Sequence, residues 1–239
     1  MLSPAQPISP ERHERIDAHL SRVVRDALAH DDRTRDLDVR AEFRGGVAHL
    51  TGAVTGPEQV DLVREFVGQF AGVLAVWDRI EVDGRAPVAV DIGCGGSKQY
   101  PGNVGFDRRR TGAVNVLADL GQGIPLRDGS VDRVFAVHVL EHLVDFLPLV
   151  DECHRVLRPG GVLHVLSPWW RYVNAVADPT HVRLLDVQTF KGICARPDSD
   201  LKWTARHAGC DGASVFADLT PLPPGSAGPS QEELGRFFD

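Results

Sequence analysis

The stretch Val88-Ala-Val-Asp-Ile-Gly-Cys-Gly-Gly-Ser97 decides the fold of this chain, together with Val104-Gly-Phe-Asp107 a few residues later. Residues 88–90 form a short apolar run, which is typical of a strand buried on both faces of a parallel sheet. The glycines that follow allow a sharp turn, in which backbone N–H groups can approach a ligand. An acid at the tip of the second strand is placed to accept two ribose hydroxyls. The two stretches together predict a crevice that binds a nucleoside.

The spacing of the glycines favours one class of nucleoside cofactor. A dinucleotide site needs G-x-G-x-x-G leading into a long helix whose N-terminus holds a pyrophosphate. Here the order is D-I-G-C-G-G-S, and Pro101-Gly102 interrupt the short gap before Asp107, which leaves no room for a long helix. The stretch resembles motif I, D-x-G-x-G, of the class I S-adenosylmethionine (SAM) methyltransferases, although Ser97 stands where many members have a third glycine.

This resemblance implies a cofactor site. The acid of motif I supports binding of the methionine ammonium group, the acid after the second strand binds the ribose, and an acid after the third strand accepts the adenine amino hydrogens. The alternative for that third acid is a simple cap on the turn 121–123. The implied cofactor-binding residues are Asp91, Gly93, Cys94, Gly95, Asp107, Arg108, Asp119, Leu120 and His138.

The resemblance is strongest over residues 124–143. Ile124-Pro-Leu-Arg-Asp-Gly-Ser-Val-Asp132 leads into an expected fourth strand, 133–137, and then into His138-Val-Leu-Glu-His-Leu143. Both phrases are similar to those of small-molecule methyltransferases. Because ligands lie at the carboxyl ends of parallel strands, His138 is expected near the methyl group. Glu141 and His142 are expected to fix the loop and to cap the next helix.

Two later segments are expected to form the acceptor site. Trp169, Trp170 and Tyr172 lie within four positions of each other, after an expected fifth strand, and favour a substrate wall. Asp178-Pro-Thr-His-Val-Arg183 is shared with the resembling methyltransferases and predicts contacts from Asp178, His181 and Arg183. The alternative for this segment is a helix-entry turn capped by Asp178 or Thr180.

Methyl transfer needs alignment of the reacting groups and, for a protonated nucleophile, a base. An imidazole suits that task near neutral pH, so His138 and His181 are the candidate catalytic residues; a structural hydrogen-bonding role is the alternative for each. Asp178 and His181 alone make a weak metal site, because two ligands without a third are poor evidence. No metal is therefore expected.

The expected fold class of residues 87–220 is α/β, a Rossmann-like seven-stranded class I methyltransferase sheet. Strand, helix and strand alternate with the spacing of right-handed parallel crossovers. Residues 201–207 and 213–219 are predicted to be antiparallel strands that close the sheet. Residues 221–239 are expected to form a linker and a C-terminal tail with a small helix.

A second, smaller domain is predicted before it. Residues 1–10 are expected to be flexible, and residues 11–84 follow the order α-β-β-α-β, with a hairpin at Gly45-Gly46. The phrase Gly46-Val-Ala-His-Leu-Thr-Gly-Ala-Val54 resembles the BON domain, a small α+β family associated with membrane or protein contacts. The resemblance implies a homodimer or a protein partner bound through this domain, or a wall over the neighbouring active site.

Composition sets the expected compartment and partners. The net charge is −7 and the only basic run is Arg108-Arg-Arg110, which argues against binding nucleic acid. No apolar run is long enough for a membrane span. The N-terminus lacks the pattern of a secretion signal, and the four cysteines show no C-x-x-C spacing, so a cytoplasmic protein with reduced thiols is expected.

Three function classes follow from these features. The favoured one is SAM-dependent methyl transfer to a small-molecule acceptor, through an oxygen or nitrogen nucleophile, with secondary metabolism as a setting that fits. The second is a non-catalytic SAM-binding protein in which the BON-like domain mediates contacts. The third is a nicotinamide oxidoreductase, for which Arg108 beside Asp107 would bind a 2′-phosphate; the spacing of motif I argues against it.

Overall fold

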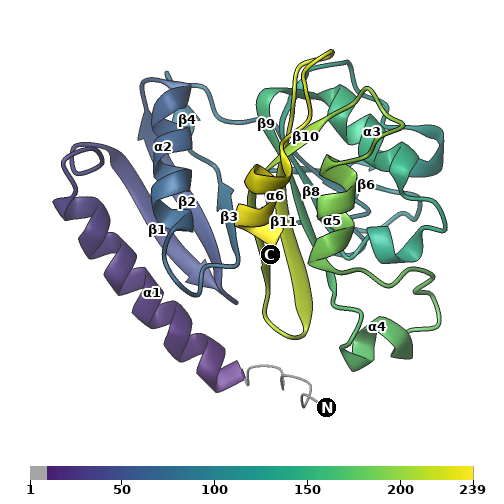
Figure 1. The fold of residues 1–239 in the computed structure, drawn as a ribbon, viewed down its shortest axis with the longest axis horizontal. Helices are drawn as coiled ribbons and strands as arrows, with labels where there is room; N and C mark the ends of the chain where they lie inside the picture. Colours follow the sequence, from purple (N-terminus) through teal and green to yellow (C-terminus); the bar gives the residue numbers. More distant parts are fainter. Residues whose placement is uncertain (1–9, 239) are drawn as a thin grey trace. The chain divides into compact units, whose positions relative to one another are not determined.

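The computed structural model describes residues 10–238 and divides into two compact units, which meet in sequence between Pro87 and Val88. Each unit contains its own cluster of buried apolar side chains. Figure 1 shows the elements of both units. Because each unit is compact, it is described by itself.

The N-terminal unit has the predicted order of elements. They are α1 (Pro10–His30), β1 (Asp38–Arg44), β2 (Val47–Val54), α2 (Pro57–Gly68), β3 (Ala75–Asp78) and β4 (Glu81–Val82). β1 and β2 form an antiparallel hairpin, and β3 and β4 both pair in parallel with β2. The one strand expected at the end of this order is two short strands in the structure, because the chain leaves the ladder at residues 79 and 80.

The hairpin turn shows why its two glycines are needed. Gly45 and Gly46 have φ of 58° and 76°. A type I′ turn, the common two-residue hairpin turn, requires such left-handed values at both positions. The carboxylate of Asp17 on α1 accepts hydrogen bonds from both glycine N–H groups, at 2.7 and 2.8 Å. The helix and the hairpin are therefore tied together at the turn.

The C-terminal unit is built on the predicted seven-stranded sheet, whose order is β10-β11-β9-β8-β5-β6-β7. Its strands are β5 (Ala89–Ile92), β6 (Val104–Asp107), β7 (Val116–Leu117), β8 (Val131–Val137), β9 (Leu157–Pro168), β10 (Trp203–Cys210) and β11 (Ser214–Pro221). The first five run parallel, and β11 pairs antiparallel with both β9 and β10. The strand order reverses at β5, so the carboxyl ends of β5 and β8 flank the switch point where ligands bind such sheets.

Four α-helices and two 3₁₀ turns accompany this sheet: α3 (Leu147–Val156), α4 (Val173–Ala177), α5 (Val187–Cys194), α6 (Gln231–Phe238), η1 (Leu120–Gln122) and η2 (Leu140–His142). The connection from β5 to β6 contains no helix, as the sequence predicts. No glycine ends α3. Leu157, directly after the helix, is already extended and begins β9.

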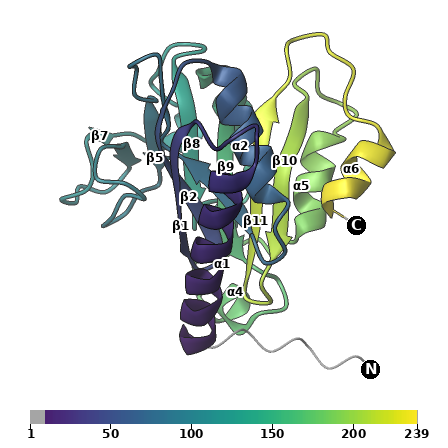
Figure 2. The ribbon, with the colours of Figure 1, turned by 90° about the vertical axis from the view of Figure 1, so that its left-hand side faces the viewer.

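The C-terminal segment is more than a tail. α6 lies beside α5 and next to β10 (Figure 2). Leu234 and Phe238 of α6 are buried in the core of the sheet domain, and the Gln188 side-chain amide of α5 donates to the backbone oxygen of Phe238 at 2.6 Å. The burial of these two apolar side chains stabilises the amphipathic helix α6. The expectation of a linker and a tail over residues 221–239 did not include this packing.

Candidate active site

The turn after β5 lies against the loop after β8. Gly93 has φ of 62°, and a Cβ at this position would lie 2.9 Å from the Cγ2 of Val139. Only glycine therefore fits, on grounds of both backbone conformation and space. Gly95 has φ of 54°, and no other atom lies within 4 Å of the place a Cβ would occupy. The turn thus leaves open space above its second glycine, where a ligand can approach the backbone.

Asp91, at the end of β5, is buried and holds this turn in shape. Its carboxylate accepts a hydrogen bond from the Gln99 N–H at 3.0 Å and one from the Asn103 side-chain amide at 2.6 Å. Burial raises the pKa of the Asp91 carboxyl, and the two hydrogen bonds oppose this rise. Its role toward a methionine ammonium group stays a prediction, whereas its role in closing the loop 93–103 is visible.

Asp107 ends β6 as predicted and is buried. Its Oδ2 accepts from the Gly95 N–H at 2.9 Å, and its Oδ1 accepts from the Arg109 N–H at 2.8 Å. An ionised carboxylate has about four acceptor sites, so two remain for ribose hydroxyls. The neighbouring Arg108 is exposed, and Cys94 contributes its backbone N–H to the Phe106 carbonyl at 3.0 Å.

The third strand ends at the expected adenine site. Asp119 Oδ1 accepts from the Gly121 N–H at 3.0 Å, which makes Asp119 the N-cap of η1, whose first residue is Leu120. The turn-capping alternative is therefore realised at one of its oxygens. The contact with adenine stays a prediction.

His138 occupies an unusual backbone position at the end of β8. Its φ is 56°, in the left-handed region that residues other than glycine rarely adopt, and its side chain is 52% exposed. Its Nδ1 lies 3.2 Å from Oε1 of Glu141. Such strained backbone is often found at functional sites, where the surrounding structure holds it in place.

Glu141 is the residue that sequence reasoning undervalued. Its side chain is buried, and its Oε2 accepts a hydrogen bond from the Ser167 hydroxyl at 2.7 Å. Burial disfavours the charged form, but the hydrogen bonds from His138 and Ser167 outweigh it and lower the pKa of Glu141 below its ordinary value. An ionised carboxylate beneath His138 orients that imidazole, as in other acid–histidine pairs.

The segment Asp178–Arg183 lies on the loop after β8. The N–H groups of Val182 and Arg183 donate to the backbone oxygen of Glu141, at 2.8 and 3.1 Å. The Arg183 guanidinium donates to the carbonyl of Val144, its Nε at 2.6 Å. Arg183, predicted to bind the substrate, is thus engaged in fastening the two loops together.

Within this segment Asp178 forms the turn that was the alternative interpretation. Its Oδ1 accepts from the Thr180 N–H at 2.8 Å and from the Thr180 hydroxyl at 2.6 Å, and these bonds lower the pKa of Asp178. The same turn brings the rings of His142 and His181 edge to face, with centroids 4.8 Å apart. The structure therefore places His181 in the same loop cluster as His138.

The two tryptophans share one partner, Asp186. The indole N–H of Trp169 and that of Trp170 both donate to Asp186 Oδ2, at 2.8 and 3.0 Å. The Arg171 guanidinium lies over both rings, about 5.5 Å from each centroid. Trp169 packs on the domain core, Trp170 is 47% exposed, and Tyr172 precedes α4 as its N-cap.

Asp186 could not be found from the sequence as a site residue, because its partners lie 16 and 17 positions away. Its Oδ1 also accepts from the Gln188 N–H at 3.0 Å and so caps α5. Glu141 carried a signal, since it lies within the phrase His138–Leu143, but its burial and its bond to Ser167 depend on the tertiary structure.

These residues fit SAM on the evidence of their geometry. The open space over Gly95, the buried acid Asp107 at the next strand and the exposed His138 at the switch point lie on one edge of the sheet. The short turn after β5 offers backbone N–H groups but no helix N-terminus for a pyrophosphate.

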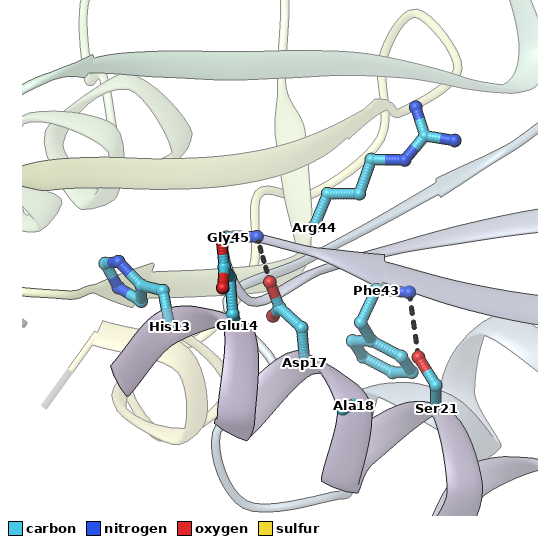
Figure 3. A pocket seen from close by; sticks show the side chains of 8 residues that line it. All are labelled: His13, Glu14, Asp17, Ala18, Ser21, Phe43, Arg44 and Gly45. Carbon is cyan, nitrogen blue, oxygen red and sulfur yellow. Dashed lines mark hydrogen bonds between the residues drawn. The ribbon is translucent and has the colours of Figure 1, made fainter. Parts of the chain in front are cut away.

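A separate shallow pocket lies wholly within the N-terminal unit. It is lined by His13, Glu14, Asp17, Ala18, Ser21, Phe43, Arg44 and Gly45 (Figure 3). Two hydrogen bonds cross it, from Gly45 N–H to Asp17 and from Phe43 N–H to the Ser21 hydroxyl at 3.3 Å. None of the predicted cofactor or substrate residues lines this pocket.

Comparisons with known proteins agree with the two units. A methyltransferase domain family matches residues 100–165, and the BON domain family matches residues 16–84. A probable SAM-dependent methyltransferase of Mycolicibacterium smegmatis is 56% identical over 45 residues, which are 19% of this chain and 18% of that protein. An uncharacterised 37.1 kDa protein in a transposon of Streptomyces fradiae is 32% identical over 178 residues, 71% of this chain and 48% of that protein.

A putative type 11 methyltransferase from Sulfolobus solfataricus has a similar solved structure, with a TM-score of 0.44 and 15% identity over 61% of this chain and 89% of that one. The chain spans less than half the length of the curated relatives described above.

The sheet order and the edge described above define a class I methyltransferase fold. The second unit carries a methyltransferase domain, which is similar to that of SAM-dependent methyltransferases, and a BON domain precedes it. No helix within residues 10–238 combines the length and the apolar character needed to cross a membrane.

Proposed function

We propose that this protein transfers the methyl group of SAM to an oxygen or nitrogen nucleophile of a small molecule, of the kind modified in secondary metabolism. The observation that carries the proposal is the meeting of the glycine turn, Asp107 and the His138–Glu141 pair at the switch point of the sheet. Trp170 and the segment 178–183 follow β9 and supply side chains for an acceptor.

SAM supplies an activated methyl group, so the protein must chiefly align the acceptor and take up its proton. Gly93, Gly95 and Asp107 hold the cofactor. Because the Glu141 carboxylate only accepts, the nearby Nδ1 of His138 carries its hydrogen, and a neutral His138 presents Nε2 as the free base. The exposed position of the ring leaves Nε2 available to the acceptor.

Cofactor binding is tested by titrating S-adenosylhomocysteine into Asp107→Ala by calorimetry. Two lost charge-assisted hydrogen bonds, at roughly 1.5–3 kcal/mol each, predict at least about a hundredfold weaker binding. The control is Asp198→Ala, which removes an exposed acid and should bind as the wild type does. Near wild-type affinity in Asp107→Ala would contradict the assignment. A melting-temperature panel with NAD and NADP tests the oxidoreductase alternative.

We also propose that the BON domain mediates dimerisation or binds a protein partner. Its support is the family match and the separate core of this unit.

A further inference from the structure

Three potential metal ligands meet beside the proposed active site. Glu141 and His142 belong to η2, and His181 comes from the segment before α5. One ligand atom from each of the three residues lies within 4.8 Å of the other two. The sequence separated His181 from the others by about forty positions, so only the docking of the segment on the loop after β8 forms this cluster.

His181 has a buried ring nitrogen that lacks a hydrogen-bond partner. Its side chain is 8% exposed, and its Nδ1 is buried without any hydrogen-bond partner among residues 10–238. The other ring nitrogen, Nε2, is 3.8 Å from Oδ2 of Asp178. A buried polar atom left without a partner costs free energy. Because His181 also meets two other potential metal ligands, its unpaired nitrogen indicates a missing ligand.

The tautomer of His142 suits metal binding. Its Nδ1 lies 3.2 Å from the backbone oxygen of Thr180 and 3.1 Å from the Thr180 hydroxyl. The carbonyl can only accept a hydrogen bond, and the hydroxyl donates its own hydrogen to Asp178 Oδ1. Nδ1 therefore carries the hydrogen, and a neutral His142 offers the lone pair of Nε2. A ligand imidazole in metalloproteins is commonly oriented in this way, by donating its other N–H to a carbonyl.

Glu141 completes the set with a charged oxygen ligand. The hydroxyl of Ser167 donates to its Oε2, which fixes the carboxylate as outer hydrogen bonds fix the ligands of metal sites. The backbone of Glu141 is held in turn by the N–H groups of Val182 and Arg183, directly after His181. Glu141 and His181 are thus held in position before any ion binds.

We propose that Glu141, His142 and His181 form a binding site for a divalent transition-metal ion of the Zn²⁺ type. Two imidazoles and one carboxylate are one of the ligand sets of catalytic zinc sites, which keep a fourth position open. Ligand atoms around tetrahedral zinc lie roughly 3.3 Å apart, so the three must close by about 1–2 Å. His142 is the exposed member of the three, so its side chain would make most of that movement.

The open position would lie next to His138, which shares Glu141 with the site. An ion there would bind an acceptor oxygen and lower the pKa of its hydroxyl. This catalytic consequence rests on the proposed function, whereas the binding of the metal does not.

The test titrates Zn²⁺ into the full, untagged, chelator-treated chain by calorimetry, with elemental analysis for stoichiometry. We expect one ion per wild-type chain. His142→Ala changes an exposed residue and His181→Ala a buried one, and each should weaken binding by more than the roughly 10–100-fold cost of an outer-shell change. The control His19→Ala removes an exposed histidine of α1 and should bind Zn²⁺ like the wild type.

Tetrahedral absorption bands of Co²⁺ provide a second readout, which should disappear in His142→Ala while its melting temperature in the absence of metal stays unchanged. Wild-type protein without a bound ion, or a His142→Ala variant that binds like the wild type, would overturn the proposal. The variants of the metal ligands, His142→Ala and His181→Ala, should retain their affinity for S-adenosylhomocysteine. Asp107→Ala should in turn still bind Zn²⁺. Failure of the metal site and failure of the methyl-transfer proposal are therefore distinguishable.

Discussion

At the scale of single residues, Asp91 shows how the cofactor turn is held. Its carboxylate is 3% exposed and satisfies two donors from the loop 93–103. Burial is the main reason that its pKa is raised above the ordinary value of 3.8. The folded protein therefore keeps a proton on Asp91 at a pH where the unfolded chain has lost it.

This shift predicts a pH-dependent difference between the wild type and Asp91→Asn. The contribution of proton uptake to stability is fully present below pH 3.8, and it is lost as the pH rises through the higher pKa of the folded state. Over that window the free energy of unfolding of the wild type should fall relative to Asp91→Asn, by at most about 1.4 kcal/mol per pH unit. Urea denaturation of both proteins from pH 3.5 to 7 measures this, and a constant difference would contradict it.

At the scale of elements, Asp186 joins two pieces of the acceptor region, the segment after β9 and α5. One carboxylate caps α5 and binds the indole N–H groups of Trp169 and Trp170, which follow β9. Aspartate is a strong N-cap, and hydrogen bonds to a charged acceptor are among the stronger ones. The orientation of both tryptophans therefore depends on a single side chain.

We predict that Asp186→Ala lowers the free energy of unfolding by about 2–4 kcal/mol, from the lost cap and the two lost indole bonds. Tryptophan fluorescence should also shift to the red, because the indoles lose their fixed partner. Chemical denaturation and emission spectra measure both effects. Asp198→Ala, at an exposed acid, is the matched control and should change neither; an equal response of the two variants would disprove the role of Asp186.

At the scale of the whole molecule, each unit has a separate core, and every cofactor motif lies in the second one. Deleting residues 1–84 should leave a domain that unfolds cooperatively and binds S-adenosylhomocysteine within a few-fold of the full chain. Its mass in solution or its substrate KM should change if the BON domain mediates contacts. Calorimetry and light scattering measure these quantities. Unchanged mass, kcat and KM would contradict a role of the BON domain in assembly or in substrate binding.

The sequence by itself determined the fold class, the absence of a helix after β5, the seven strands and the α-β-β-α-β unit. The strands, the turns and the missing helix follow from local causes: apolar runs of strand length, glycines that permit left-handed turns, and a Pro-Gly pair that leaves no room for a long helix. The fold class follows from the resemblance of the motifs to known families. Gly93, Gly95, Asp107 and His138 were also predictable as a group, because parallel strands present their carboxyl ends at one edge.

Only the tertiary structure decided the contacts that join distant segments. It placed His181 beside His142 and Glu141, made Arg183 a fastening between two loops, and gave Trp169 and Trp170 a shared carboxylate. It also packed Leu234 of the expected tail into the core. Periodicity and motif spacing report the neighbours of a residue along the chain, whereas these contacts arise where loops from different strands pack on each other, and no local pattern encodes that packing.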